Sequence, residues 1–117
     1  MQPLDIDSYC AKYEQAMAIL GKRWTGLIVR ALLSGACRFN NISAYVPGLS
    51  DRLLSERLKE LESVGIVERH VYPDTPVRIE YVLTPKGQGL RDIVAVVQAW
   101  ADEWATEAVE TTPAHGS

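Results

Sequence analysis

A run of polar and basic side chains between residues 50 and 59 could perform recognition chemistry. Its members are Ser50, Arg52, Ser55 and Lys59. On a helix with 3.6 residues per turn they share the face opposite the apolar residues of the same segment, Leu54, Leu58 and Leu61. Arginine can bond a guanine edge through two donors, and serine and lysine can donate to phosphate oxygens. The pattern therefore predicts a helix that contacts double-stranded DNA through this polar stripe.

The same residues also fit an ordinary solvent-exposed helix face, and Glu56 and Glu62 favour that interpretation locally. Arg57 borders the leucine side and is expected to point back toward the body of the domain. The elements around the stripe must decide between the two interpretations.

Residues 47–83 supply that context. Pro47-Gly48 breaks the chain, Ser50 is a strong N-cap with Asp51 in the first turn, and Gly65 fits a left-handed helix end. Two β-rich runs follow at 66–72 and 77–83, joined by a loop with two prolines. Both faces of the first run carry apolar residues, so its register stays open. A capped amphipathic helix that leads into a hairpin predicts a winged helix-turn-helix.

The flanking sequence predicts further helices. Apolar spacing indicates helices at 9–20 and 24–33, and Asn40 is a plausible N-cap for a short helix at 41–46. Residues 37–39 could pair as a third strand. Thr84 as cap and Pro85 at the first helical position open a last helix that runs to about residue 105. The predicted fold is mainly α with a small β-hairpin (α+β): a flexible arm at 1–8, one winged-helix domain with dimerisation helices at 9–105, and a frayed acidic tail at 106–117.

Other candidate DNA contacts lie on the elements around the stripe. Lys22 and Arg23 precede a helix, where the helix dipole disfavours cations. Their placement is explained if a DNA phosphate approaches that helix end, and the alternative is that they form an exposed polar turn. Arg38 and Asn40 begin the helix before the polar stripe. Arg78 adjoins the hairpin tip and is a candidate DNA contact. The alternative to this role is an ion pair across the two strands with Glu68 or Glu80.

The two ends of the domain carry apolar faces. The candidate dimer-interface residues are Tyr13, Met17, Ile93, Val97, Trp100 and Trp104. Trp100 and Trp104 could instead line a ligand cavity. The last helix has too large an apolar face to remain exposed to solvent, which favours a homodimer.

Composition sets broad limits. The chain has 117 residues and a net charge of −3, which fits one soluble domain. Residues 92–117 hold five acids and neither Lys nor Arg, so the rest of the chain has a net charge of +2 and can carry a basic face. The two cysteines are expected to be reduced, no metal site or cofactor is expected, and no run is long enough for a membrane span. A cytoplasmic protein is the expectation.

At this point the sequence resembles the HxlR-type transcriptional regulators, relatives of the MarR group. The resemblance covers about residues 9–104 and is carried by Gly21-Lys22-Arg23-Trp24-Thr25, Ile28-Val29-Arg30-Ala31-Leu32, Arg38-Phe39, Pro47-Gly48-Leu49-Ser50, the runs 54–61, 65–69 and 78–87, and Trp100. It implies a homodimer, joined through its terminal helices, that binds a roughly palindromic operator. Some members of the family sense electrophiles or oxidants through a cysteine near the N-terminus, followed by proline. Cys10 has that position here, but Ala11 follows it.

Three hypotheses of different classes remain. The first is a DNA-binding regulator, mostly a repressor, which responds to an electrophile, an oxidant or a small ligand. The second is a winged helix that serves as a protein-interaction module, which the net acidity favours. The third is a thiol enzyme that uses Cys10. The evidence against this hypothesis is that no His or Asp is placed by the sequence to form a relay with Cys10. For Cys10 itself the alternative to a sensor is a small apolar residue at the dimer interface.

Overall fold

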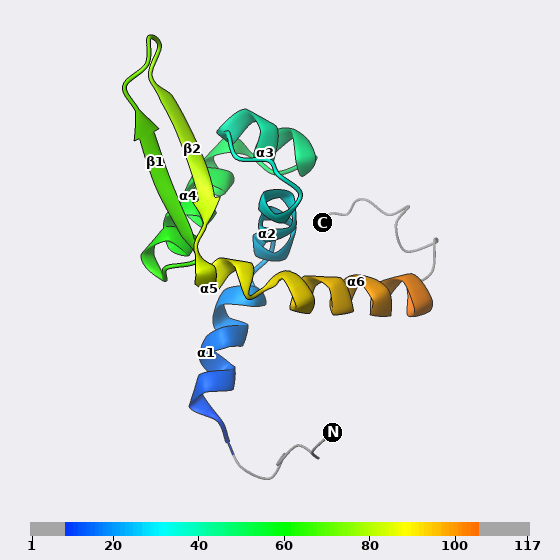
Figure 1. The fold of residues 1–117 in the computed structure, drawn as a ribbon. Coiled ribbons are helices and arrows are strands. Elements are labelled where there is room, and N and C mark those ends of the chain that lie inside the picture. The colour runs from blue at the N-terminus through cyan, green and yellow to red at the C-terminus, as the bar shows by residue number, and fades with distance from the viewer. Residues whose placement is uncertain (1–8, 106–117) are drawn as a thin grey trace.

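The computed structural model describes residues 9–105, so the predictions for 1–8 and 106–117 lie outside it. The elements in chain order are α1 (Ala11–Leu20), α2 (Thr25–Leu33), α3 (Phe39–Tyr45), α4 (Asp51–Ser63), β1 (Val67–Tyr72), β2 (Arg78–Leu83), α5 (Pro85–Gln88) and α6 (Arg91–Trp104). Figure 1 shows the hairpin rising from a body of α2, α3 and α4, with α1 and α6 projecting from it. The predicted fold class, mainly α with one hairpin, is confirmed.

The core lies between α2, α3, α4 and the base of the hairpin. Its most deeply buried side chains are Ile28, Val29, Ile42, Leu54, Leu58, Leu61 and Val67. The three leucines of α4 are at most 1% exposed, so the helix is held along its full length. Because burial of each leucine contributes about 1.5–3 kcal/mol, this stripe fixes the rotation of α4 about its axis.

Both ends of α4 follow the predicted chemistry. The Ser50 hydroxyl accepts a hydrogen bond from the N–H of Leu53 at 3.1 Å, which satisfies one of the free donors of the first turn. At the other end Gly65 has φ 81°, and the N–H of Ile66 donates to the carbonyl of Leu61 at 2.9 Å. This left-handed ending turns the chain directly from α4 into β1.

The hairpin has the register that the sequence left open. β1 and β2 pair antiparallel from Val67 opposite Leu83 to Tyr72 opposite Arg78. Val67 and Leu83 are both buried, so the base of the hairpin belongs to the core while its tip extends beyond it. The third strand expected at 37–39 is reduced to one backbone hydrogen bond, from the N–H of Tyr81 to the carbonyl of Cys37 at 2.8 Å.

The predicted cap of α3 is wrong. The helix begins at Phe39, Arg38 holds the cap position in an extended conformation without a side-chain cap bond, and Asn40 is already helical. Ile42 is fully buried and Phe39 packs against the core, whereas Asn40 is exposed. Burial of these two apolar residues explains where the helix starts better than the capping preference of asparagine.

The single long helix predicted after Thr84 is also wrong. Thr84 does act as a cap, accepting from the N–H of Gly87 at 3.1 Å, and Pro85 holds the first position. However, α5 ends at Gln88, and α6 begins at Arg91 in a new direction. Gly87 packs directly against the Ile66 carbonyl, where a Cβ would collide, and glycine favours helix breaks. This close approach docks α5 on the hairpin base before α6 leaves the body.

The outer helices are poorly covered. Within residues 9–105, α1 and α6 bury none of their residues, in contrast to α2 and α4. The radius of gyration is 16.2 Å, compared with about 13 Å for a compact chain of this size. The projecting helices therefore lack the packing partners that an amphipathic helix requires.

Candidate nucleic-acid interface

The polar stripe of α4 faces solvent, as the leucine pattern predicts. The side chain of Arg52 is 80% exposed, Lys59 is exposed, and Ser55 is half-buried beside the hairpin. Ser50 occupies the cap position at the start of the helix. Because the leucines fix the opposite face, these four side chains form one accessible surface on a rigid element.

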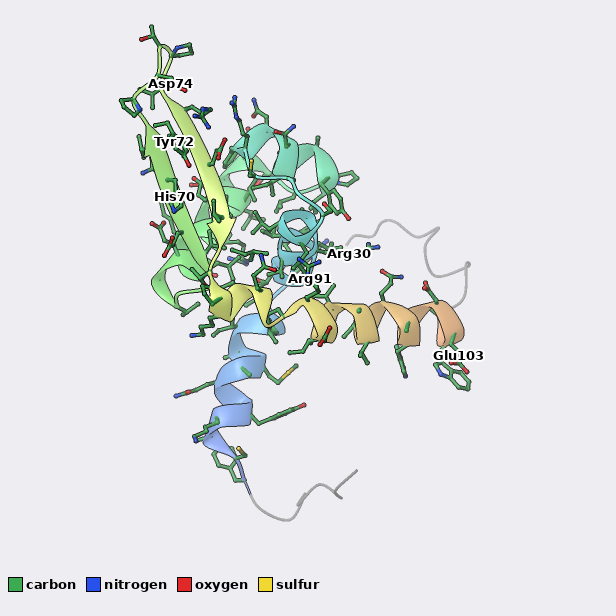
Figure 2. All side chains as sticks on the ribbon, in the orientation of Figure 1. Arg30, His70, Tyr72, Asp74, Arg91 and Glu103 are labelled. Carbon is green, nitrogen blue, oxygen red and sulfur yellow. The ribbon has the colours of Figure 1, made fainter. Side chains whose placement is uncertain are left out.

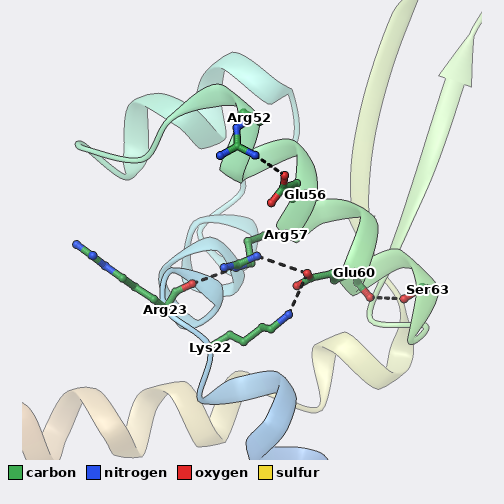
Figure 3. Close-up of polar contacts among 7 residues, drawn as sticks. All are labelled: Lys22, Arg23, Arg52, Glu56, Arg57, Glu60 and Ser63. Atoms are coloured by element: carbon green, nitrogen blue, oxygen red, sulfur yellow. Dashed lines mark hydrogen bonds and ion pairs between the residues drawn. The ribbon is translucent and has the colours of Figure 1, made fainter. Parts of the chain in front are cut away.

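Arg52 is held by a neighbour on the same helix. Its Nη1 donates to the Glu56 carboxylate at 2.9 Å, four residues further along (Figure 3). An exposed pair of this kind contributes at most about 1 kcal/mol, so an approaching base or phosphate can replace Glu56 at small cost. The pair keeps the guanidinium on the stripe without burying it.

A second group of charges ties α4 to the turn between α1 and α2. Glu60 accepts from Lys22 Nζ at 3.0 Å and from Arg57 Nη1 at 3.4 Å. Arg57 Nε donates to the backbone carbonyl of Arg23 at 3.2 Å, and the three elements meet in Figure 3. Arg57 thus points toward the body, as expected. Lys22, a predicted DNA contact, is engaged with Glu60 in this arrangement.

Arg23 lies over the neighbouring aromatic ring. Its guanidinium carbon is 4.6 Å from the centre of the Trp24 ring, a cation–π geometry. Trp24 has φ 80°, an uncommon value for a residue other than glycine, and precedes the first residue of α2. The turn that carries Lys22 and Arg23 is therefore well defined.

Arg78 is the most constrained cation of the hairpin. It donates from Nε to Asp74 at 2.9 Å and from Nη1 to Glu80 at 2.6 Å, and its guanidinium lies 4.0 Å from the centre of the Tyr72 ring. Hydrogen bonds to Asp74, and then to Glu80, raise the pKa of Arg78. The pairing with Glu80 runs along one strand, whereas Glu68 pairs with His70 at 3.0 Å.

The fold brings three predicted contacts together. A hollow of about 400 Å³ between the start of α3 and the outer part of β2 is lined by Arg38, Asn40 and Arg78. Arg78 follows Arg38 by 40 positions and Asn40 by 38 in the sequence, but the three residues converge beside the hairpin. The hollow offers guanidinium and amide donors to one ligand, which suits a backbone phosphate.

Arg69 on β1 is a further cation of the hairpin, where the sequence favours Arg78 as the DNA contact. It lines a groove of about 330 Å³ together with Ser55, Lys59 and Tyr81. In the hairpin Arg69 is opposite Tyr81, on the face that meets α4. Its place beside the polar stripe follows from the register, which the apolar pattern of both strand faces had left undecided.

Cys10 caps α1. Its Sγ accepts from the N–H of Tyr13 at 3.4 Å, and the residue is exposed. Cys37 is also a free thiol, half-buried beside β2. Over residues 9–105 no group of three His, Cys, Asp or Glu could hold a metal ion, and no helix is long and apolar enough to cross a membrane.

The six predicted dimer-interface residues are all exposed. On α1 these are Tyr13 and Met17, and on α6 they are Ile93, Val97, Trp100 and Trp104. Trp100 and Trp104 are 65% and 64% exposed, which is unusual for the largest apolar side chain. Among residues 9–105 they belong to an apolar face that is open to solvent.

Comparisons with known proteins agree with this architecture. The pattern of the HxlR-like helix-turn-helix family matches residues 19–109. The chain belongs to the HxlR family. The HTH-type transcriptional regulator YvaP of Bacillus subtilis is 56% identical over 95 residues, which cover 81% of this chain and 88% of YvaP. The regulator YodB of the same organism is 48% identical over 98 residues, which cover 84% and 88%.

Solved structures of two transcriptional regulators have a similar fold. The reduced form of YodB matches with a TM-score of 0.73, covering 84% of this chain and 96% of that one. YodB has also been solved after diamide treatment and with bound quinone. The redox regulator HypR in its oxidised form matches with a TM-score of 0.76 at 32% identity, covering 82% and 99%. This HxlR-family chain is therefore a winged-helix, DNA-binding transcriptional regulator and not an enzyme.

Arg57 and Arg52 should differ in their contributions to the free energy of unfolding. Arg57→Ala is expected to lower the free energy of unfolding by about 1–2 kcal/mol, because it removes the bonds from α4 to the Arg23 carbonyl and to Glu60. Arg52→Ala should change it by less than about 0.5 kcal/mol, because its pair is exposed. Urea denaturation at one fixed protein concentration measures both. Equal losses for the two variants would contradict the structural role of Arg57.

Proposed function

We propose that this HxlR-family protein is a cytoplasmic homodimeric repressor that binds a roughly palindromic operator sequence-specifically. The observation that carries the proposal is the exposed stripe on α4, anchored from behind by fully buried leucines and flanked by a hairpin that carries Arg69 and Arg78. The proposed DNA contacts are Lys22, Arg23, Arg38, Asn40, Ser50, Arg52, Ser55, Lys59 and Arg78, with Arg69 added from the groove beside α4.

The contacts divide by chemistry. Arg52 and Ser55 lie in the first half of α4, the part of a recognition helix that meets base edges in the major groove. Ser50 and Lys59 at the two ends of the stripe suit phosphate oxygens. The hollow with Arg38, Asn40 and Arg78 supports a backbone contact at the hairpin, where Arg78 exchanges a carboxylate for a phosphate.

The exposed apolar faces of α1 and α6 are proposed to pack against a second copy of the chain. One domain presents one short reading helix, and a twofold dimer would present two to a palindromic site. The apolar residues left exposed on α1 and α6 are of the kind that dimer interfaces bury, and they include two tryptophans. The operator-binding unit would then be the dimer.

Cys10 is the proposed sensor of an electrophile or oxidant. Support comes from its exposed thiol at the start of α1, next to the proposed dimer face. The relatives point the same way, since YodB is described in diamide-treated and quinone-bound forms and HypR as a redox regulator. Modification of Cys10 would alter α1 and, through Lys22 and Glu60, the position of α4.

Arg52→Ala should reduce affinity for the operator by about 1–3 kcal/mol and leave affinity for a scrambled duplex nearly unchanged, because a base contact carries sequence information. Lys59→Ala should weaken both complexes alike and reduce the dependence on salt by about one phosphate contact. Fluorescence anisotropy over a salt series measures these effects, with DNA from around the chain's own coding region as the source of the operator.

Lys12→Ala serves as the control for this series, because it removes a cation on α1 away from α4. Equal loss on both duplexes for Arg52→Ala would assign Arg52 to phosphate alone. Absence of any sequence preference in the unmodified protein would overturn the proposal in favour of a protein-interaction module.

Trp100→Asp should break the dimer. A buried tryptophan at the centre of an interface commonly contributes about 2 kcal/mol or more, so the dimer dissociation constant should rise at least about 30-fold. Ala99→Asp adds the same charge at the preceding position, which lies outside the apolar face of α6, and should leave the dimer intact. Sedimentation velocity over a concentration series distinguishes the two, and a Trp100→Asp variant that dimerises like the parent would refute the proposed interface.

Treatment with diamide or a quinone should change operator affinity in the parent protein but not in Cys10→Ser. Cys37→Ser is the matched control, since it removes the other thiol and should keep the response. Anisotropy before and after treatment gives the readout, and mass spectrometry identifies the modified residue. If the parent and Cys10→Ser respond alike, Cys10 is not the sensor.

A further inference from the structure

Three backbone carbonyls at the C-terminal end of α4 are bonded by a distant part of the chain. They belong to Val64, Gly65 and Ile66, the residues between α4 and β1. Lys86 Nζ donates to the Val64 carbonyl at 2.6 Å, and the Thr84 hydroxyl donates toward the carbonyls of Gly65 and Ile66. The N–H of Thr84 adds a bond to the Ile66 carbonyl at 3.0 Å. Among residues 9–105, all the donors to these carbonyls therefore come from α5 and its cap.

Lys86 supplies a positive charge that α4 itself lacks. The C-terminal end of a helix carries a partial negative charge, and a cation at that end is stabilising. The last turn of α4 contains no basic residue but two acidic ones, Glu60 and Glu62. The cation comes instead from Lys86, 22 positions beyond the carbonyl that it bonds. The end of α4 is thus completed by an element that follows the hairpin.

The junction between α4 and β1 has little else to fix its angle. Gly65 has φ 81°, a conformation that glycine enters and leaves readily. Gly87 of α5 lies so close to the Ile66 carbonyl that a Cβ would collide with it, and Figure 1 shows α5 at the base of the hairpin. The bond from the N–H of Tyr81 to the Cys37 carbonyl also holds β2, but it leads to the segment before α3 and not to α4.

The hairpin would amplify a movement at this junction. Its ladder runs from Val67 opposite Leu83 at the base to Tyr72 opposite Arg78 near the tip. Figure 2 shows Tyr72 and Asp74 at the end of the hairpin that is remote from α5. Five strand residues span about 17 Å, so a rotation of about 10° at the base would move Arg78 by about 3 Å. A hydrogen bond from Arg78 to a phosphate would not survive a displacement of that size.

We propose that Lys86 and Thr84 are positioning residues for DNA recognition. Together they clamp the base of the hairpin to the C-terminal end of α4, and the clamp sets the distance between the polar stripe of α4 and Arg78. Neither side chain touches DNA in this role. The inference rests on the proposed function for its effect on DNA binding, whereas the clamp itself is a property of the free protein.

A double-mutant cycle tests whether Lys86 acts through the hairpin. Arg78→Ala should weaken binding to the operator duplex about fivefold or more in the parent but less than about twofold in a Lys86→Met background, because a displaced Arg78 has little contact left to lose. Lys59→Ala should weaken binding by the same factor in both backgrounds, since Lys59 lies on α4 itself. Fluorescence anisotropy measures the four affinities of each cycle.

Matched variants separate positioning from general stability. Lys86→Arg keeps the cation and should preserve the full effect of Arg78→Ala. Thr84→Val removes the hydroxyl at nearly constant shape and should act like Lys86→Met, whereas Thr84→Ser keeps the hydroxyl and should act like the parent. A purely structural role would weaken the Arg78 and Lys59 contacts alike. The proposal is overturned if Arg78→Ala costs as much in the Lys86→Met background as in the parent.

Residual dipolar couplings of backbone amides test the clamp without DNA. In the free, full-length parent the couplings of α4 and of the hairpin should fit one common orientation. In Lys86→Met the hairpin couplings should decrease or require a different orientation, while those of α4 remain unchanged. One common orientation in both proteins would refute the clamp. If the parent shows no preference for any operator but the couplings change as expected, the proposed function fails and the clamp stands.

Discussion

The burial of three leucines along α4 is the constraint on which the rest of this structure depends. Leu54, Leu58 and Leu61 are almost completely enclosed, and their burial determines which face of the helix remains outside. The same packing places Gly65 where the chain can turn into β1, so the hairpin starts from a fixed point. A loss of this packing would change the rotation of the polar stripe and the direction of the hairpin together. Recognition in this fold is thus a consequence of core packing.

Acidic neighbours hold three of the seven cations that are proposed to meet DNA. Glu56 holds Arg52, Glu60 holds Lys22, and Asp74 with Glu80 holds Arg78. The exposed pairs Arg52–Glu56 and Lys22–Glu60 are weak, so exchanging either for a phosphate or a base costs little when the geometry matches. When the geometry does not match, the carboxylates remain in place and repel the DNA backbone. The balance lowers indiscriminate attraction to nucleic acid, in keeping with a chain whose net charge is −3.

The sequence predicted what local signals control and missed what tertiary contacts control. The cap at Ser50, the left-handed Gly65 and the leucine stripe depend on neighbouring residues, and all three agree with the structure. Gly87 of α5 meets the Ile66 carbonyl, a contact across 21 residues that periodicity cannot reveal, and the helix breaks two residues later at Gly89 and Leu90. The convergence of Arg38 with Arg78, and of Arg69 with the stripe on α4, likewise depends on strand register. The spatial grouping of the candidate residues therefore could not be predicted from local sequence signals.

The two sides of α6 suggest how a terminal helix can serve both assembly and control. One side carries Trp100 and Trp104 and lacks a cover, whereas the other carries Arg91 and faces the ends of α2 and α3. No residue of α6 is buried, so its angle to the body is set by few contacts. In a twofold dimer that angle sets the distance between the two reading helices. Since a palindromic operator accepts a narrow range of spacings, a small change at the base of α6 would be converted into a change in DNA affinity.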